Sequence, residues 1–262
     1  MSPPIEHVII AMPAHDEQQL VGSALTAVLA AIQHAEGQTG ARFHIGVSAH
    51  RCSDATFSVA SAALADGDVD AVVLRDRDSR TVGGVRRRLI SVLLDGSMPP
   101  DRTWVFSTDA DSVVPRDWIS GLLVAAESSG AVAVAGMTDL VGWQATQEER
   151  AAYDRLIADG LRPQAGHAHV YAANLAVRLD AYLGSGGFRD VPHGEDHCLL
   201  GRVRRHGGVV ATPRWPRVLT SGRTVGRASH GLASLLASLR ADGARPAGLG
   251  HLGLRPADAG PS

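Results

Sequence analysis

Two carboxylates one residue apart, Asp109 and Asp111, follow the short apolar segment 103–107. If that segment is a β-strand, residues i and i+2 at its end can point the same way, and their like charges then repel. A divalent cation relieves the repulsion, because hard cations bind carboxylate oxygens readily. Asp-x-Asp alone is a weak signal, since aspartates also cap helices and hydrogen-bond within turns. The pair therefore predicts a metal site only if other polar groups gather beside it.

The first half of the chain alternates short apolar segments with segments of helical periodicity. The predicted strands are 7–12, 43–48, 70–74 and 103–107. The predicted helices are 20–37, 55–65 and 86–94, and residues 16–19 would form a charged first turn of the first helix. This alternation predicts a mostly parallel sheet covered by helices, in which ligands bind at the carboxyl ends of the strands. The polar segments 13–17, 50–54 and 109–111 all fall at those ends, so we expect them to share one edge of the sheet.

The second half is less regular. We expect strands at 132–136 and 209–212, a helix at 146–160, and a helix through 199–206 that the acidic pair Glu195 and Asp196 opens. Carboxylates in a first helical turn are favoured by the helix dipole, which is an ordinary structural reason for this pair. Beyond about residue 240 the Ala, Gly, Pro and Arg content predicts a disordered tail, 241–262.

Composition excludes several classes of function. The 262 residues carry a net charge of −2, which argues against a nucleic-acid partner, and all 25 basic residues are arginines, which excludes a lysine Schiff base. The two cysteines show no pairing pattern, which favours a reducing compartment. We expect no signal peptide, because the residues before Val8 contain no basic region and no long apolar core. We also expect no integral membrane segment, because the most apolar stretch, 119–137, has a polar centre. These features predict a soluble, cytoplasmic protein and give no indication of its oligomeric state.

Seven short motifs occur in an order that resembles family 2 glycosyltransferases of the GT-A fold, over Val8 to about Arg227. They are IIAMPAHDE (9–17), CSDAT (52–56), GGVRR (83–87), DAD (109–111), NLAVR (174–178), GGF (186–188) and GED (194–196). Each motif is weak alone, whereas the ordered set is specific. The resemblance implies an α/β fold with a Rossmann-like, mostly parallel central sheet, helices on both faces and a smaller acceptor-side subregion. It implies one domain, 1–240, with a nucleotide-sugar half at about 5–115 and an acceptor half at about 116–240.

The resemblance also implies an activity. Such enzymes transfer a sugar, here expected to be a hexose, from a nucleotide diphosphate sugar to a hydroxyl acceptor with inversion. Mg²⁺ or Mn²⁺ on Asp109 and Asp111 would neutralise the diphosphate, and Asp196 would be the general base. The acceptor is expected to be small or lipid-like, because the long transmembrane segments of processive synthases are missing.

The matching motifs also assign residues to the two substrates. The expected donor-binding residues are Pro13, Ala14, Glu17, Asp54, Gly83, Arg86, Asp109, Ala110, Arg223 and Arg227, and the expected acceptor-binding residues are Asn174, Gly187 and Glu195. Many relatives have an acidic uracil-reading residue where this chain has His50 and Arg51, so a guanosine donor is no less expected than a uridine donor.

Several of these residues also have ordinary structural explanations. Glu17 and Asp54 could cap helices, Arg86 could lie on a solvated helix face, and Arg223 and Arg227 could belong to a surface loop. Arginines after the last strand could instead close over a diphosphate, because guanidinium groups match phosphate geometry.

The histidines offer weaker candidates. His167 and His169 are spaced as alternate residues of a strand, where hydrogen bonding is more common than metal binding. His193 and His230 lie closer to the motifs and are better candidates for a site.

Two other functions remain open. A sugar nucleotidyltransferase would share the α/β architecture but needs a glycine-rich, basic loop after the first strand, whereas residues 13–19 are acidic and contain no glycine. A non-catalytic nucleotide-sugar binding protein is the other possibility, and the intact acidic pairs at 109–111 and 195–196 argue against it.

Overall fold

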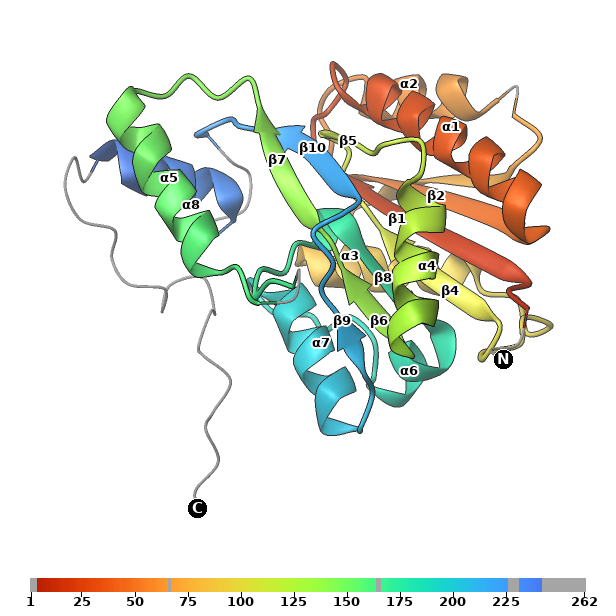
Figure 1. Ribbon diagram of the computed structural model, residues 1–262. Helices are drawn as coiled ribbons and strands as arrows, with labels where there is room; N and C mark the ends of the chain where they lie inside the picture. The colour runs from red at the N-terminus through yellow and green to blue at the C-terminus, as the bar shows by residue number, and fades with distance from the viewer. Residues whose placement is uncertain (1–3, 66, 164–165, 226–230, 242–262) are drawn as a thin grey trace.

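The computed structural model describes residues 4–65, 67–163, 166–225 and 231–241 (Figure 1). A seven-stranded sheet forms its centre, in the order β3 (Asp70–Asp76), β2 (Arg42–His50), β1 (His7–Ala14), β4 (Thr103–Ser107), β8 (Leu175–Arg178), β6 (Ala133–Ala135) and β9 (Val210–Ala211). Strands β1 to β4 are mutually parallel, and only β8 runs antiparallel to its neighbours. The predicted mostly parallel α/β sheet is thus confirmed.

Helices cover both faces of this sheet because its strands are apolar on both sides. In β1, Val8, Ile10 and Met12 face the cluster formed with helices α1 (Val21–Thr39), α2 (Thr56–Leu64) and α4 (Trp118–Ser129). Ala11 faces the opposite cluster, which includes α3 (Val82–Leu93), α6 (Leu179–Gly184) and α7 (Glu195–Arg205). Side chains alternate along a strand, so one buried strand serves both layers.

A second, smaller sheet and a helix pair extend the molecule on one side (Figure 1). Strand β10 (Arg217–Ser221) lies between β5 (Ser112–Val113) and β7 (Met137–Val141). Helices α5 (Gln147–Asp159) and α8 (Leu232–Ala241) lie side by side and share a cluster around Trp143 and Tyr153. None of the helices in the described segments is long and apolar enough to span a bilayer.

Several boundaries differ from the sequence-based expectations. Helix α1 begins at Val21, so residues 16–19 lie in the turn before it instead of forming its first turn. Helix α3 begins at Val82, four residues earlier than expected, because the Thr81 hydroxyl accepts the Gly84 N–H at 3.2 Å and caps it. Strand β10 and helix α8 were not expected at all, and the tail beyond Ala241 lies outside the described residues.

The buried side chain of Asn174 joins the two sheets. It lies at the end of the short 3₁₀ helix η1 (Ala172–Asn174), and its amide donates to the carbonyls of Met137 at 2.8 Å and Pro216 at 2.9 Å. Its carbonyl oxygen accepts the indole N–H of Trp118 at 2.9 Å. All three bonds are buried, so each lost bond would leave a polar group without water.

We predict that Asn174→Ala lowers the free energy of unfolding by about 3 kcal/mol, because it leaves three buried polar partners unsatisfied. Urea unfolding followed by fluorescence measures the change. Gln33→Ala, at an exposed position of α1, is the control and should change stability by less than about 0.5 kcal/mol. Equal stability of the two variants would contradict the role given to Asn174.

Candidate active site

A cavity of about 1060 Å³ opens at the carboxyl ends of β1, β2 and β4. Segments far apart in the chain line it together, which is the arrangement expected for ligand sites in parallel sheets. The lining includes these residues singled out from the sequence: Pro13, Ala14, Glu17, Arg86, Asp109, Ala110, Asp111, Glu195, Asp196 and Arg223.

Arg86 joins the two acidic motifs. Its side chain projects from α3 and is only 2% exposed. One guanidinium nitrogen donates to Asp109 Oδ1 at 2.5 Å, another donates to Glu195 Oε1 at 2.5 Å, and Nε donates to Ser107 Oγ at 2.9 Å. The guanidinium therefore holds the turn after β4 against the first turn of α7. Charge-assisted bonds of this kind are strong, and here they are also shielded from water.

Arg223 forms a second bridge from the segment after β10. It donates to both carboxylate oxygens of Glu17, at 2.6 and 3.0 Å, and lies 2.8 Å from Asp111 Oδ2. Asp109 and Asp111 are therefore held by different arginines. Burial raises the pKa of Asp111 to about 6, helped by the neighbouring Asp109 charge and opposed by Arg223. The arginines therefore do not fully compensate the negative charge of the Asp pair, and its hard oxygen donors suit Mg²⁺ or Mn²⁺.

Asp196 lies in the first turn of α7, after Gly194, whose φ of +70° starts the helix in a left-handed conformation. Its Oδ2 accepts the Ala172 N–H at 3.0 Å, and its Oδ1 accepts the His197 N–H at 2.7 Å. Burial raises the pKa of Asp196, while the His197 N–H, the Arg86 charge and the Ala172 N–H act in the opposite direction. The carboxylate is therefore fixed in place, and burial makes it more basic than one in water.

Two expected donor-site residues do not line the cavity. Asp54 accepts the Thr56 N–H at 2.9 Å and the Thr56 hydroxyl at 2.5 Å, so it organises the start of α2. Gly83 allows a close approach of α3 to the chain around Arg189, because a Cβ there would lie 2.2 Å from the Arg189 carbonyl oxygen.

The expected acceptor residues divide in the same way. Glu195 lines the cavity, whereas Asn174 is fully engaged in the core and Gly187 packs against Tyr182 with a φ of +62°. Arg227 and His230 lie outside the described residues.

The histidines take mostly structural roles. His167 Nε2 bonds the Pro213 carbonyl at 3.0 Å, and His169 Nε2 bonds the Ile157 carbonyl at 3.0 Å. Burial lowers the pKa of His167 to about 4, so it is neutral at physiological pH. His169 and His193 line the cavity.

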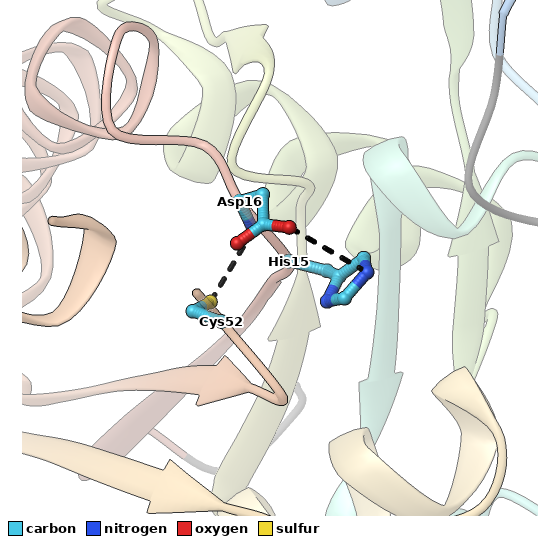
Figure 2. A group of neighbouring side chains, drawn as sticks. All are labelled: His15, Asp16 and Cys52. Atoms are coloured by element: carbon cyan, nitrogen blue, oxygen red, sulfur yellow. Dashed lines mark hydrogen bonds and ion pairs between the residues drawn. The ribbon is translucent and has the colours of Figure 1, made fainter. Parts of the chain in front are cut away.

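The loops after β1 and β2 are joined by His15, Asp16 and Cys52 (Figure 2). The ligand-type atoms of these side chains lie within 4.8 Å of one another, but each has a structural partner. Asp16, at a φ of +53°, accepts the Ser53 N–H at 2.7 Å and donates its own N–H to Cys52 Sγ at 3.3 Å. His15 Nδ1 bonds the His50 carbonyl at 2.7 Å. We interpret the cluster as a structural contact that fixes the loops after β1 and β2 to each other at the wall of the cavity.

One part of the cavity wall was not identified from the sequence. Tyr153, Tyr171 and the residues of α8 line the cavity there. The signal for α8 was present, since Leu232, Leu235, Leu236 and Leu239 recur at helical spacing.

We predict that Arg86→Met destabilises the protein by about 3 kcal/mol at pH 7, because Asp109 and Glu195 lose their buried counter-charge. The loss should shrink at pH 5. Without Arg86 the folded-state pKa of Glu195 rises further above its unfolded value, so the folded variant takes up protons as pH falls and gains stability relative to the native protein.

Urea titrations at the two pH values measure this change. Arg87→Met, at the exposed neighbouring position of α3, is the matched control. A penalty for Arg86→Met that is no larger than that of the control would rule out the bridging role.

Comparisons with known proteins identify the fold. No protein-family model and no curated protein sequence matches the chain. Several solved structures match the chain. S. aureus TarS 1–349 in complex with UDP-GlcNAc matches with a TM-score of 0.60 and 11% identity, over 87% of this chain and 61% of that chain. The mannosyltransferase PcManGT from Pyrobaculum calidifontis, in complex with GDP-Man and Mn²⁺, matches with a TM-score of 0.62 and 17% identity, over 85% of this chain and 58% of that chain.

A third match is GalNAc-T7 with UDP, GalNAc and Mn²⁺, with a TM-score of 0.61 and 11% identity, over 83% of this chain and 44% of that one. The chain thus spans about three fifths or less of these structures. At such identities the likeness concerns the fold alone. The protein has the GT-A fold that the ordered motifs predicted.

Proposed function

We propose that the protein is a metal-dependent, inverting glycosyltransferase that moves a sugar, a hexose in the simplest case, from a nucleotide diphosphate sugar to a hydroxyl acceptor. The observation that carries the proposal is one cavity with an Asp-x-Asp pair and a separate buried carboxylate, Asp196, organised around Arg86. The GT-A structures of TarS, PcManGT and GalNAc-T7 hold UDP-GlcNAc, GDP-Man and UDP, and the latter two include Mn²⁺. In this proposal residues 5–115 form the donor half and residues 116–240 form the acceptor half.

Asp109 and Asp111 would hold Mg²⁺ or Mn²⁺, which as a Lewis acid neutralises the charge that develops on the leaving diphosphate. Pro13, Ala14 and the backbone of Ala110 lie on the same wall and would contact the nucleotide. Arg223 already lies against Asp111 and can donate to a diphosphate oxygen from the same side.

Asp196 would receive the proton of the acceptor hydroxyl. As that oxygen bonds to the anomeric carbon, the bond from this carbon to the diphosphate oxygen breaks, and the nucleoside diphosphate leaves. A raised pKa suits this role because a more basic carboxylate takes the proton more readily. The hydrogen bond from Ala172 fixes the carboxylate, so it does not reorient during the reaction.

The two alternative functions account for fewer features. The loop that ends β1 is acidic at Glu17, and that carboxylate lines the cavity, which disfavours a triphosphate for a nucleotidyltransferase. A binding protein without catalysis would not explain why Asp196 is held separately from the Asp pair on the proposed acceptor side. His50 and Arg51 line the nucleotide end and leave both uridine and guanosine donors open.

We predict that Asp196→Asn reduces sugar transfer at least a hundredfold while leaving nucleotide affinity within about threefold, because it removes only the proton acceptor. Release of UDP or GDP from UDP-GlcNAc or GDP-Man, with a panel of hydroxyl compounds, measures transfer. Glu127→Gln, at an exposed position of α4, is the control and should retain full activity. Transfer that survives in Asp196→Asn would refute the assignment of the base.

We also predict that Asp109→Asn combined with Asp111→Asn abolishes the Mn²⁺-dependent part of UDP or GDP binding. Calorimetry with and without Mn²⁺ measures this part, which should exceed tenfold in the native protein. Asp117→Asn is the control for a carboxylate outside the cavity. An equal effect of Mn²⁺ on the double variant and on the native protein would exclude these two residues as the metal ligands.

A further inference from the structure

The cavity has a second end that differs chemically from the first. We call it the apolar arm, and its walls come from α5, from α8 and from the segment before η1. It consists of Tyr153, Leu156, Ile157, His169, Val170, Tyr171, Leu232 and Leu235. None of these described lining residues carries a carboxylate, a guanidinium or an ammonium group, in contrast to the end around Arg86.

The residues of the arm line the cavity, and several of them also belong to the packed face between α5 and α8. Tyr153, Leu236 and Leu239 are buried between α5 and α8, while Leu156 and Leu235 are only partly buried and line the cavity. Apolar surface that is left open inside a concave site is the usual lining of a small-molecule pocket. The helix pair therefore places leucine side chains where a ligand would cover them.

Tyr153 adds an aromatic ring to this wall. Its ring is 8% exposed and packs edge-on against Trp143, with 5.4 Å between ring centroids. Within the described part of the chain, its buried hydroxyl has no hydrogen-bond partner. The hydroxyl oxygen is closed off from the cavity as well as from water, so a ligand in the arm meets the ring of Tyr153 and not its hydroxyl.

The arm is directly connected to the proposed catalytic carboxylate. The Ala172 N–H binds Asp196, and the preceding residues Val170 and Tyr171 line the arm. The arm and Asp196 therefore adjoin within one cavity, and a molecule that lies in the arm can extend to the carboxylate.

We propose that the arm selects an acceptor that carries an apolar ring system, and that it positions the acceptor hydroxyl at Asp196. The inference rests on the proposed glycosyl transfer and specifies its acceptor class. A free sugar fits less well, because it needs many hydrogen-bond partners and the arm offers few. The ring system would cover Leu156 and Leu235 and lie against the ring of Tyr153.

The test compares 4-nitrophenyl β-glucoside with methyl β-glucoside, by calorimetry and without any nucleotide. The two probes share the sugar and differ in the aromatic ring, which the arm would cover. We expect the nitrophenyl compound to bind at least tenfold more tightly. Equal affinity for the two probes would overturn the proposal.

Variants separate the arm from a nonspecific effect. Leu156→Asn should weaken nitrophenyl glucoside binding at least fivefold, whereas Leu183→Asn, at a leucine of α6 that is 51% exposed, should not. Tyr153→Phe should leave this affinity within about twofold, because its hydroxyl does not face the cavity, and should leave the unfolding midpoint unchanged or raised, because it removes an unsatisfied hydroxyl. Full affinity in Leu156→Asn would overturn the location.

Failure of this inference can be told apart from failure of the proposed function. Binding of UDP or GDP with Mn²⁺ is measured on the same protein in a separate titration. Nucleotide binding without a preference for the aryl probe rejects the arm and leaves glycosyl transfer standing. A preference for the aryl probe with no binding of either nucleotide rejects the transfer and leaves only an apolar binding site.

Discussion

The structure depends on the compensation of buried negative charge at one edge of its sheet. Five carboxylates, those of Glu17, Asp109, Asp111, Glu195 and Asp196, gather in one cavity, and two arginines bridge four of them. Buried charges are costly unless they are paired, so Arg86 and Arg223 stabilise the carboxylates that they bridge. Two further arginines, Arg51 and Arg80, also line the cavity. A divalent cation at Asp109 and Asp111 would add positive charge on the side where the two aspartates lie together.

The fold supplies the geometry that this compensation needs. Parallel strands bring the ends of β1 and β4 to the same edge, which puts Glu17 and the Asp pair on one wall. Arg86 reaches Glu195 only because α3 approaches the chain near Arg189 closely, and the missing side chain at Gly83 permits that approach. A residue that does not line the cavity thus sets the distance between α3 and the first turn of α7.

The first half of the fold could be predicted from the sequence, because buried parallel strands and amphipathic helices leave strong periodic signals over β1 to β4. The second half could be predicted only in part. The expected strands at 132–136 and 209–212 and the expected helices at 146–160 and 199–206 correspond to β6, β9, α5 and α7. By contrast, β10 and α8 were not expected, and β5 has only two residues, too few to show a period. The motifs identified many of the cavity residues, but their ion pairs were not predictable. Arg86 and Glu195 are 109 positions apart, and Arg223 and Glu17 are 206 positions apart, so only the tertiary fold pairs them.

One short segment, residues 171–174, organises the part of the cavity wall that holds Asp196. Asn174 binds three buried partners and fixes the end of η1, the Ala172 N–H holds Asp196, and Tyr171 lines the apolar arm. Asn174 therefore influences this wall through the core, although it does not line the cavity. The position of the Asp196 carboxylate thus follows from core packing, while the helices α5 and α8 set the apolar lining beside it.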